Sequence, residues 1–359
     1  MYLKELKARQ FKNFDENNFE FSSKINAFVG QNGKGKTNVL DAIHYLALSK
    51  SYLNHSDVMN IQFECDFFTL EGTFDKNESD DVIFCLVRSG QPKQLKRNSK
   101  SYDRISDHIG QYPLVMISPY DSDLIKEGSD VRRKFLDNII SQSNKQYLTD
   151  LIRYNKVLAQ RNALLKYFAA NQTFDATSLE IYDNELLHFG QKIHAVRKEF
   201  IQTFLDAFLK YYNEISEGRE KVNIEYVSQL NDAPFETVLK DALFKDRAAQ
   251  YSTAGIHKDD LLFTITNYPI KKYGSQGQQK SYLIALKLAQ LEVIKRSLHI
   301  TPLLLLDDIF DKLDEHRVMQ LIKLVNEERF GQIFITDTHP DRTENIIKQI
   351  NAESKVFRL

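Results

Sequence analysis

The chain has 359 residues, of which 42% are hydrophobic and 27% are charged, as in an ordinary folded protein of one or two domains. Its formal net charge of -1 excludes binding of nucleic acid through a global excess of positive charge, so such binding would need a local basic face. The N-terminal sequence MYLKELKARQ lacks the apolar core of a signal peptide, and the longest apolar runs are too short to span a bilayer. We therefore expect a cytoplasmic protein with no membrane contact.

The first 120 residues predict mainly β-structure around a single helix at 36–48. A strand at 113–118 ends in the turn cluster SPYDSD, which favours a domain boundary there. Alternating or continuous apolar patterns predict further strands at 2–11, 18–21, 25–29, 67–74 and 82–87.

The texture changes at residue 121. Residues 121–209 repeat apolar positions at intervals of three and four, the pattern of long amphipathic helices. A strand at 222–227, another helix and a strand at 261–266 follow, and the last hundred residues alternate helix and strand. The order predicts an α/β fold with two parts. A head with a mixed sheet and helices comprises 1–120 and 250–359, and a mainly helical arm is inserted at 121–249.

A glycine-rich segment between the predicted strand 25–29 and the predicted helix has the pattern G-x-x-x-x-G-K-[ST]. Glycines let backbone N–H groups converge on phosphate oxygens, and the helix N-terminus adds partial positive charge. Lys36 is expected to contact the β- and γ-phosphates of ATP, and Thr37 to bind Mg²⁺. The predicted ATP-binding residues are Gly30, Gln31, Asn32, Gly33, Lys34, Gly35, Lys36, Thr37 and Asn38.

The apolar run 303–306 ends in two carboxylates, Asp307 and Asp308. A solvated strand end would have the same pattern, but together with the glycine loop the pair predicts a second part of a nucleotide site. Asp307 is expected to hold Mg²⁺ together with Thr37, and Asp308 to polarise the attacking water, so that Asp308 and Lys36 are the catalytic candidates. Many ATPases of this kind carry Glu at the second position. The shorter Asp predicts slow turnover.

Residues 273–280, YGSQGQQK, precede an amphipathic helix and resemble the signature of ABC-type ATPases. The resemblance implies that this motif touches the γ-phosphate held by an opposite subunit, so that two copies complete each site. A simple helix cap with Ser275 as the first residue is the alternative. The signature residues are Ser275, Gln276, Gly277, Gln278 and Gln279.

Two further motifs of the same superfamily are expected downstream. Asp311 and Asp314 fit its D-loop, which lies across the dimer interface. Thr338 or His339 fits the switch that senses the γ-phosphate, although His339 stands later than usual and a surface histidine explains it equally well.

Longer phrases resemble the RecF family of bacterial recombination mediators, which is similar to SMC heads but has a short helical arm. The resemblance spans nearly the whole chain, with Ile256 and Lys258 departing from the family's usual Pro and Arg. The phrases are LKARQFKNF at 6–14, SPYDSDL at 118–124, VRRKFLD at 131–137, QRNALLK at 160–166, GIHKDDL at 255–261 and SQGQQK at 275–280.

The resemblance implies an ATP-dependent homodimer that binds double-stranded and gapped DNA and hydrolyses ATP slowly, with weak stimulation by DNA. It also implies cooperation with RecR and RecO in loading RecA. Arg161 is expected to be structural, whereas for Arg132 and Arg133 a structural role is an alternative to DNA contact. DNA contacts are expected from a basic cluster that a solvated hairpin would explain equally well. The DNA candidates are Lys50, Lys93, Lys96, Arg97 and Lys100, with Arg104 beside them.

Two other functions remain open from the residues alone. Another SMC-like DNA clamp, such as an anti-phage ATPase, shares the nucleotide motifs, and a transporter ATPase subunit shares them without the arm. A small-molecule kinase would have no use for the signature.

Overall fold

The computed structural model describes residues 1–76, 78–308, 330–349 and 352–359. By the contacts within the chain, it divides into two compact units. We call Met1–Asp121 with Lys280–Leu359 the head, and Ser122–Gln279 the arm. The first boundary lies next to the one expected at 120, but the chain returns to the head at 280 and not at 250. Among the described residues, no helix is long and apolar enough to cross a membrane.

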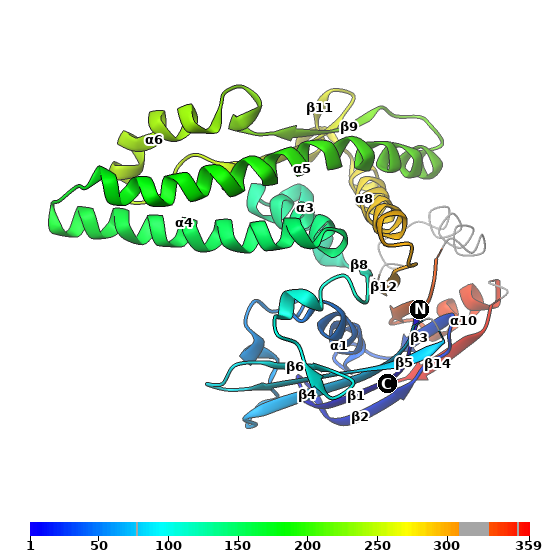
Figure 1. Cartoon of the computed structure of the whole chain (residues 1–359). Helices are drawn as coiled ribbons and strands as arrows, with labels where there is room; N and C mark the ends of the chain where they lie inside the picture. The colour runs from blue at the N-terminus through cyan, green and yellow to red at the C-terminus, as the bar shows by residue number, and fades with distance from the viewer. Residues whose placement is uncertain (77, 309–329, 350–351) are drawn as a thin grey trace. The chain divides into compact units, whose positions relative to one another are not determined.

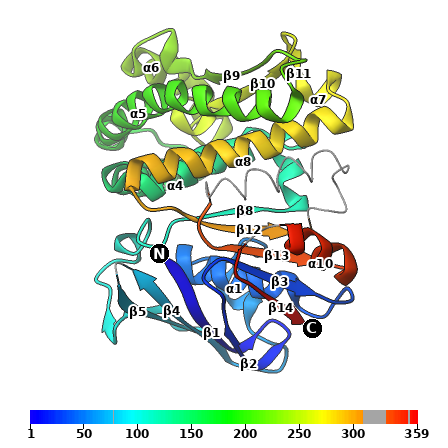
Figure 2. The same cartoon turned by 90° about the vertical axis from the view of Figure 1, so that its right-hand side faces the viewer.

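A five-stranded parallel sheet forms one layer of the head (Figure 2). Four of its strands are buried at almost every position, which is why they read as continuous apolar runs in the sequence. In spatial order the strands are β14 (Ser354–Arg358), β3 (Ile25–Val29), β13 (Ile333–Asp337), β12 (Leu303–Asp307) and β8 (Leu114–Ile117).

A six-stranded antiparallel sheet forms a second layer of the head. Its strands alternate between buried and partly exposed residues, as expected for a sheet with one face on the core. The short polar strands at its edge have no apolar pattern, and the sequence did not predict them. In spatial order the strands are β2 (Phe14–Glu20), β1 (Tyr2–Phe11), β4 (Phe67–Lys76), β5 (Ser79–Arg88), β6 (Gln94–Arg97) and β7 (Lys100–Ser101).

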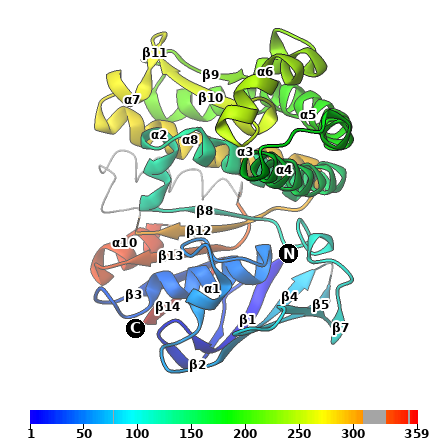
Figure 3. The ribbon, with the colours of Figure 1, turned by 90° about the vertical axis from the view of Figure 1, so that its left-hand side faces the viewer.

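Helix α1 (Lys36–Leu48) lies between the two sheets and contacts strands of both (Figure 3). Its residues from Val39 to Leu48 are all buried, the polar Asp41 and His44 among them, so the helix is enclosed on every side. Helix α10 (Pro340–Gln349) packs near β3. The helix expected at HRVMQLIKLVNEE lies outside the described residues.

The arm consists of helices and a small antiparallel sheet. Helices α4 and α5 run side by side along it (Figure 1). The helices are α2 (Asp123–Lys126), α3 (Ser129–Ser143), α4 (Lys145–Asn171), α5 (Ala176–Ser216), α6 (Phe235–Ala249), α7 (Ile270–Tyr273) and the start of α8 (Gln276–Leu298). Short 3-10 turns occur at Asp57–Asn60, Ile105–Asp107, Pro119–Ser122, Gln229–Asn231 and Ile256–Lys258.

The chain returns to the head only at residue 280 because the strands before that point pair with each other in the arm. Strand β10 (Asp260–Ile265) pairs with β9 (Val222–Val227) over its whole length, and β11 (Tyr268–Pro269) continues the same sheet. The strand expected at 261–266 is therefore present, but it belongs to the arm.

Buried arginines tie the arm helices together. Arg161 is fully buried and donates to Asp183 at 2.6 Å, to Asp246 at 2.6 Å and to Ser252 at 2.8 Å. Arg197 bonds to Asp137 at 2.8 Å and Asp259 at 2.7 Å in the same way. These contacts confirm that Arg161 has a structural role in the arm.

Arg132 and Arg133 also have partners within the arm. Arg132 forms a bidentate pair with Asp260, with bonds of 2.7 Å and 3.0 Å. Arg133 donates to the carbonyl of Asp259 at 2.6 Å. Both arginines therefore anchor α3 to the start of β10 and the residue before it.

We predict that Arg161→Ala destabilises the arm by about 3–5 kcal/mol, because it leaves the buried carboxylate of Asp246 without its partner. Urea unfolding measures the change. Lys156→Ala, at an exposed position on the same helix, should change stability by no more than about 0.5 kcal/mol. Equal effects of the two substitutions would contradict the role of the buried pair.

Candidate nucleotide site

The glycine loop lies between the end of β3 and the start of α1. Gly33 and Gly35 have φ angles of +83° and +97°, which side chains rarely adopt. A Cβ on Gly35 would also lie 2.8 Å from atoms of Asn13 and Phe14. The loop therefore needs glycine for its curl and, at Gly35, for its close approach to the turn between β1 and β2.

Lys36 is buried under the loop. Its side chain donates to the carbonyls of Gly30 at 2.6 Å and Gln31 at 2.9 Å. A buried ammonium needs such acceptors, and an anion is its natural further partner. Gln31, Asn32 and Lys34 are exposed on the rim of the loop.

The first acidic residue of β12 faces the loop helix. Thr37 Oγ1 donates to Asp307 Oδ1 at 2.9 Å, and Thr336 Oγ1 donates to the same oxygen at 2.7 Å. Thr336 is placed there because β13 lies between β3 and β12 in the sheet. Sequence reasoning missed it, and the only signal was a hydroxyl at the end of the apolar strand IFITD.

Asp307 and Asp337 end adjacent strands and are both buried. The pKa values of their carboxyl groups are nevertheless shifted in opposite directions. Burial raises the pKa of Asp307, and the bonds from Thr336 and Thr37 offset this only in part. Burial also acts to raise the pKa of Asp337, but the bonds from Arg342 and Thr343 outweigh it, so that pKa is lowered.

Asp308 borders a cavity of about 160 Å³ at the glycine loop. Its backbone N–H donates to Thr336 Oγ1 at 2.9 Å, and its φ angle of +48° is uncommon for a residue other than glycine. The cavity is smaller than the roughly 300 Å³ at the lower end of small-molecule sites. Its walls are Asn32, Gly33, Gly35, Lys36, Thr37, Asn38, Asp308 and Thr336.

The two switch candidates lie just beyond β13. Thr338 Oγ1 and His339 Nδ1 are 2.9 Å apart, and the histidine side chain is 66% exposed. The backbone N–H of His339 donates to the buried Asp337 at 3.1 Å. The position of this pair is therefore fixed by β13, the strand that also carries Thr336.

The signature motif begins helix α8. Ser275 and Gln278 form a reciprocal cap, in which Gln278 N donates to Ser275 Oγ at 3.2 Å and Ser275 N donates to Gln278 Oε1 at 2.7 Å. Gln279 donates to the carbonyl of Gly274 at 3.0 Å. The capping interpretation is therefore correct within one chain, while Ser275 and Gln276 are exposed at the helix N-terminus and Gly277 is half-buried. The D-loop candidates Asp311 and Asp314 lie outside the described residues.

The basic cluster divides into two kinds of side chain. Lys93 pairs with Asp57 at 2.9 Å and donates to the carbonyl of Ser49, and Arg97 forms two bonds with Asp81, at 2.9 Å and 2.8 Å. Both side chains are therefore paired within the head, and their DNA role stays a prediction. Of the remaining candidates Lys96 is half-buried, and Lys50, Lys100 and Arg104 are exposed.

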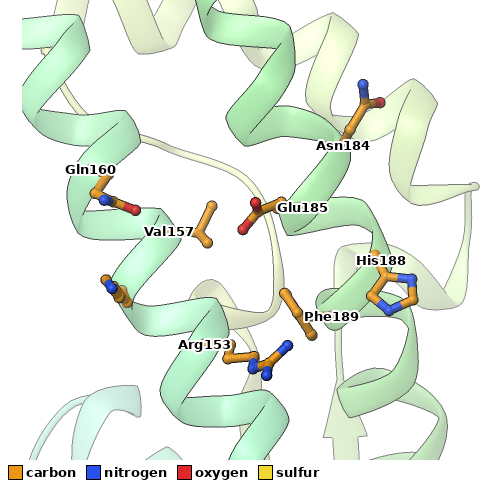
Figure 4. Close-up of a pocket in the computed structure, with 8 residues that line it drawn as sticks. Arg153, Val157, Gln160, Asn184, Glu185, His188 and Phe189 are labelled. Carbon is orange, nitrogen blue, oxygen red and sulfur yellow. The ribbon is translucent and has the colours of Figure 1, made fainter.

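A second cavity, of about 680 Å³, lies between α4 and α5 of the arm (Figure 4). Arg153 lies over the ring of Phe189 at 5.8 Å, and Glu185 is the one carboxylate in its wall. Although it is larger, its described wall residues include neither a glycine loop nor a pair of acidic residues. The residues that the sequence predicts to bind ATP line the smaller cavity of the head instead.

A glycine loop, an acidic strand end beside it and a helical insertion define an ABC-type ATPase head of the SMC kind, as the sequence predicted. The model of the family described as RecF/RecN/SMC N terminal domain matches residues 2–357. A protein of Flavobacterium johnsoniae named DNA replication and repair protein RecF is 53% identical over 359 residues, covering 100% of both chains. The chain therefore belongs to the RecF family of DNA replication and repair proteins.

Solved structures agree with this family. A structure described as the recombination mediator protein RecF-ATP in the RecFOR pathway has a TM-score of 0.89 at 30% identity and covers 99% of this chain and 95% of that one. An SMC head bound to the C-winged helix domain of ScpA has a TM-score of 0.56 at 16% identity, covers 100% of this chain and 94% of that one, and shares the fold alone.

We predict opposite effects for the two buried aspartates. The raised pKa of Asp307 means that its charge opposes folding at neutral pH, so Asp307→Asn should raise the melting temperature of the protein without nucleotide or Mg²⁺. The lowered pKa of Asp337 means that its charge supports folding there, so Asp337→Asn should lower it. Both differences should shrink as the pH falls and the carboxyl groups become protonated. Changes of equal sign at pH 7 would contradict the assignment.

Proposed function

We propose that this protein is an ATP-dependent, dimerising DNA-binding ATPase of recombinational repair and replication restart. The observation that carries the proposal is the contact between Thr37 and Asp307 beside a cavity too small to enclose a whole nucleotide. One copy supplies the phosphate-binding half of the site, and a second copy supplies the other half.

The residues at the loop suit Mg²⁺. Mg²⁺ prefers oxygen ligands and is usually held by one or two protein groups together with phosphates and water. Thr37 Oγ1 and Asp307 Oδ1 offer two such oxygens from different elements, held 2.9 Å apart. When bound, the ion would neutralise charge between the β- and γ-phosphates.

Catalysis needs a group that orients water and a charge on the phosphates. Lys36 supplies the charge at the β- and γ-phosphates, and Asp308, on the wall of the cavity, orients the water. The fixed backbone of Asp308 and its short side chain fit slow hydrolysis. Thr338 and His339, which follow β13, sense whether the γ-phosphate is present.

The second half of the site comes from the signature of the opposite copy. The exposed N-terminus of α8 presents Ser275, Gln276 and Gly277 with the partial positive charge that favours a phosphate. ATP then bridges two surfaces, and hydrolysis removes the bridge. The rate of ATP hydrolysis therefore sets how long the dimer stays on DNA.

The DNA that is held is double-stranded or gapped, and its phosphates meet the basic residues of the head. Lys96, Lys100 and Lys50 remain candidates, with Arg104 beside them. Relatives named RecF and the RecFOR pathway named for a solved structure support cooperation with RecR, RecO and, through them, RecA. The same relatives argue against an anti-phage clamp or a transporter subunit.

We predict that Asp308→Asn abolishes ATP hydrolysis and leaves ATP binding within about twofold, because the substitution keeps the size of the side chain and removes its charge. Light scattering with ATP and Mg²⁺ should show a stable dimer of this variant. Adding Ser275→Arg to Asp308→Asn should keep ATP binding and return the protein to a monomer. A dimer that persists with Arg at 275 would contradict the composite site.

We predict that Lys96→Glu with Lys100→Glu weakens binding of duplex DNA and lowers the salt dependence by about one unit of slope per lysine. Lys24→Glu with Lys348→Glu changes the net charge equally at two exposed positions elsewhere in the head and serves as the control. Fluorescence anisotropy over a salt titration measures both. Identical curves for the two double variants would remove the cluster from the DNA interface.

A further inference from the structure

The cavity at the glycine loop provides for phosphates but not for a base. Among the described residues, its walls contain no aromatic side chain. Asp308 is the wall residue expected near the γ-phosphate, and Asn38 is the wall residue that follows Thr37 in α1. We take the side of Asn38 as the one on which the nucleoside leaves the cavity.

From Asn38, contacts lead to one neighbouring turn of the head. Asn38 Nδ2 donates to Asn13 Oδ1 at 2.6 Å, and Asn13 is exposed in the turn between β1 and β2. Two residues on, Asp15 Oδ1 accepts from Gln62 Nε2 at 2.5 Å. The next residue after Gln62 is Phe63, whose side chain is exposed, at 88%.

The segment that carries Phe63 is held firmly. Lys12 N donates to the carbonyl of Asn60 at 2.8 Å, and Gln62 N donates to the carbonyl of Gln10 at 2.9 Å. Asn60 is fully buried and donates to carbonyls of its own turn. The backbone just before Phe63 is therefore fixed to β1, while the Phe63 ring itself is exposed to water and free to contact a ligand.

The same segment is anchored at its start by a charged network. Asp57 accepts from the buried Tyr45 hydroxyl at 2.5 Å and pairs with Lys93 at 2.9 Å. Lys93 therefore has a purpose here that is separate from DNA, because it fixes the segment 57–63 against α1 and β6.

We propose that Phe63 is the base-binding platform of the nucleotide site, with the Gln62–Asp15 pair bordering the edge of the purine. This proposal rests on the proposed function, in that it assumes ATP phosphates at the glycine loop. A flat aromatic ring stacks on any purine, and the amide and carboxylate offer hydrogen-bond groups at its edge. The ligand is the adenine base of ATP or ADP.

Charge favours a base over a nucleic-acid backbone at this place. Four exposed carboxylates lie near Phe63 along the chain or in the adjoining turn, and phosphates of DNA would be repelled by them, whereas a neutral base is not. They are Asp15, Glu16, Glu64 and Asp66.

Two other readings of the exposed aromatic residues make different predictions. If Phe63 were part of an apolar docking surface for a protein, Met59, which is 66% exposed in the same segment, would act with it and neither would affect nucleotides. If the base were held by the opposite copy, the exposed Tyr273, two residues before Ser275, would be the platform.

The test uses calorimetric titration of the full-length protein with ATP, ADP and inorganic tripolyphosphate in the presence of Mg²⁺. Phe63→Ala should weaken ATP and ADP by about tenfold, the typical loss of one stacked base, and should leave tripolyphosphate unchanged. Phe63→Trp should retain wild-type affinity, and Met59→Ala is the matched control that should have no effect. The exposure of Phe63 makes unfolding by these changes unexpected, and a melting curve checks it.

Each other outcome overturns the proposal in a recognisable way. Wild-type affinity of Phe63→Ala for ATP rejects the platform, and a base-dependent loss in Tyr273→Ala instead assigns the base to the opposite copy. Equal weakening of ATP and tripolyphosphate by Phe63→Ala means that the residue acts on the phosphate loop and not on the base. If the wild-type protein binds neither ligand, the nucleotide site itself fails, and this proposal with it.

Discussion

The hydrogen bond between Thr37 and Asp307 joins two segments that are 270 residues apart in the chain. It can form only when β12 and β3 lie in one parallel sheet with β13 between them, because that order brings the acidic strand end to the start of α1. Thr336 completes the group from the intervening strand. The nucleotide site therefore forms only when the whole parallel sheet of the head is folded. The buried carboxylate of Asp307, which the site needs at this position, opposes folding.

Sequence patterns predicted the parts of the site that depend on local geometry. The glycine loop, the buried strands and helix α1 have signals within a few residues, and the structure has them where expected. Thr336 had no such signal, because its role comes from a neighbouring strand. The ion pairs of Lys93 with Asp57 and of Arg97 with Asp81 also had no local signal, because their partners lie on other segments of the chain.

The arm shows the same limit at a larger scale. Its long helices were evident from their periodicity, but the segment 250–279 was assigned to the head because β-rich texture returned there. Pairing of β10 with β9, across a gap filled by α6, cannot be read from either strand alone. Buried arginines such as Arg161 then fix the helices by charge rather than by apolar packing alone. Ionic partners far apart in sequence determine this part of the fold.

Because α1 is buried between two sheets, the position of the catalytic residues depends on how the core around this helix packs. A helix that is buried on all sides cannot shift without disturbing both layers, and its first turn carries Lys36 and Thr37. Enlarging or shrinking a side chain such as Ala42 or Leu46, distant from any phosphate, would move the loop as a rigid extension of the helix. Substitutions in this core would thus lower ATPase activity although every motif residue of the site is unchanged.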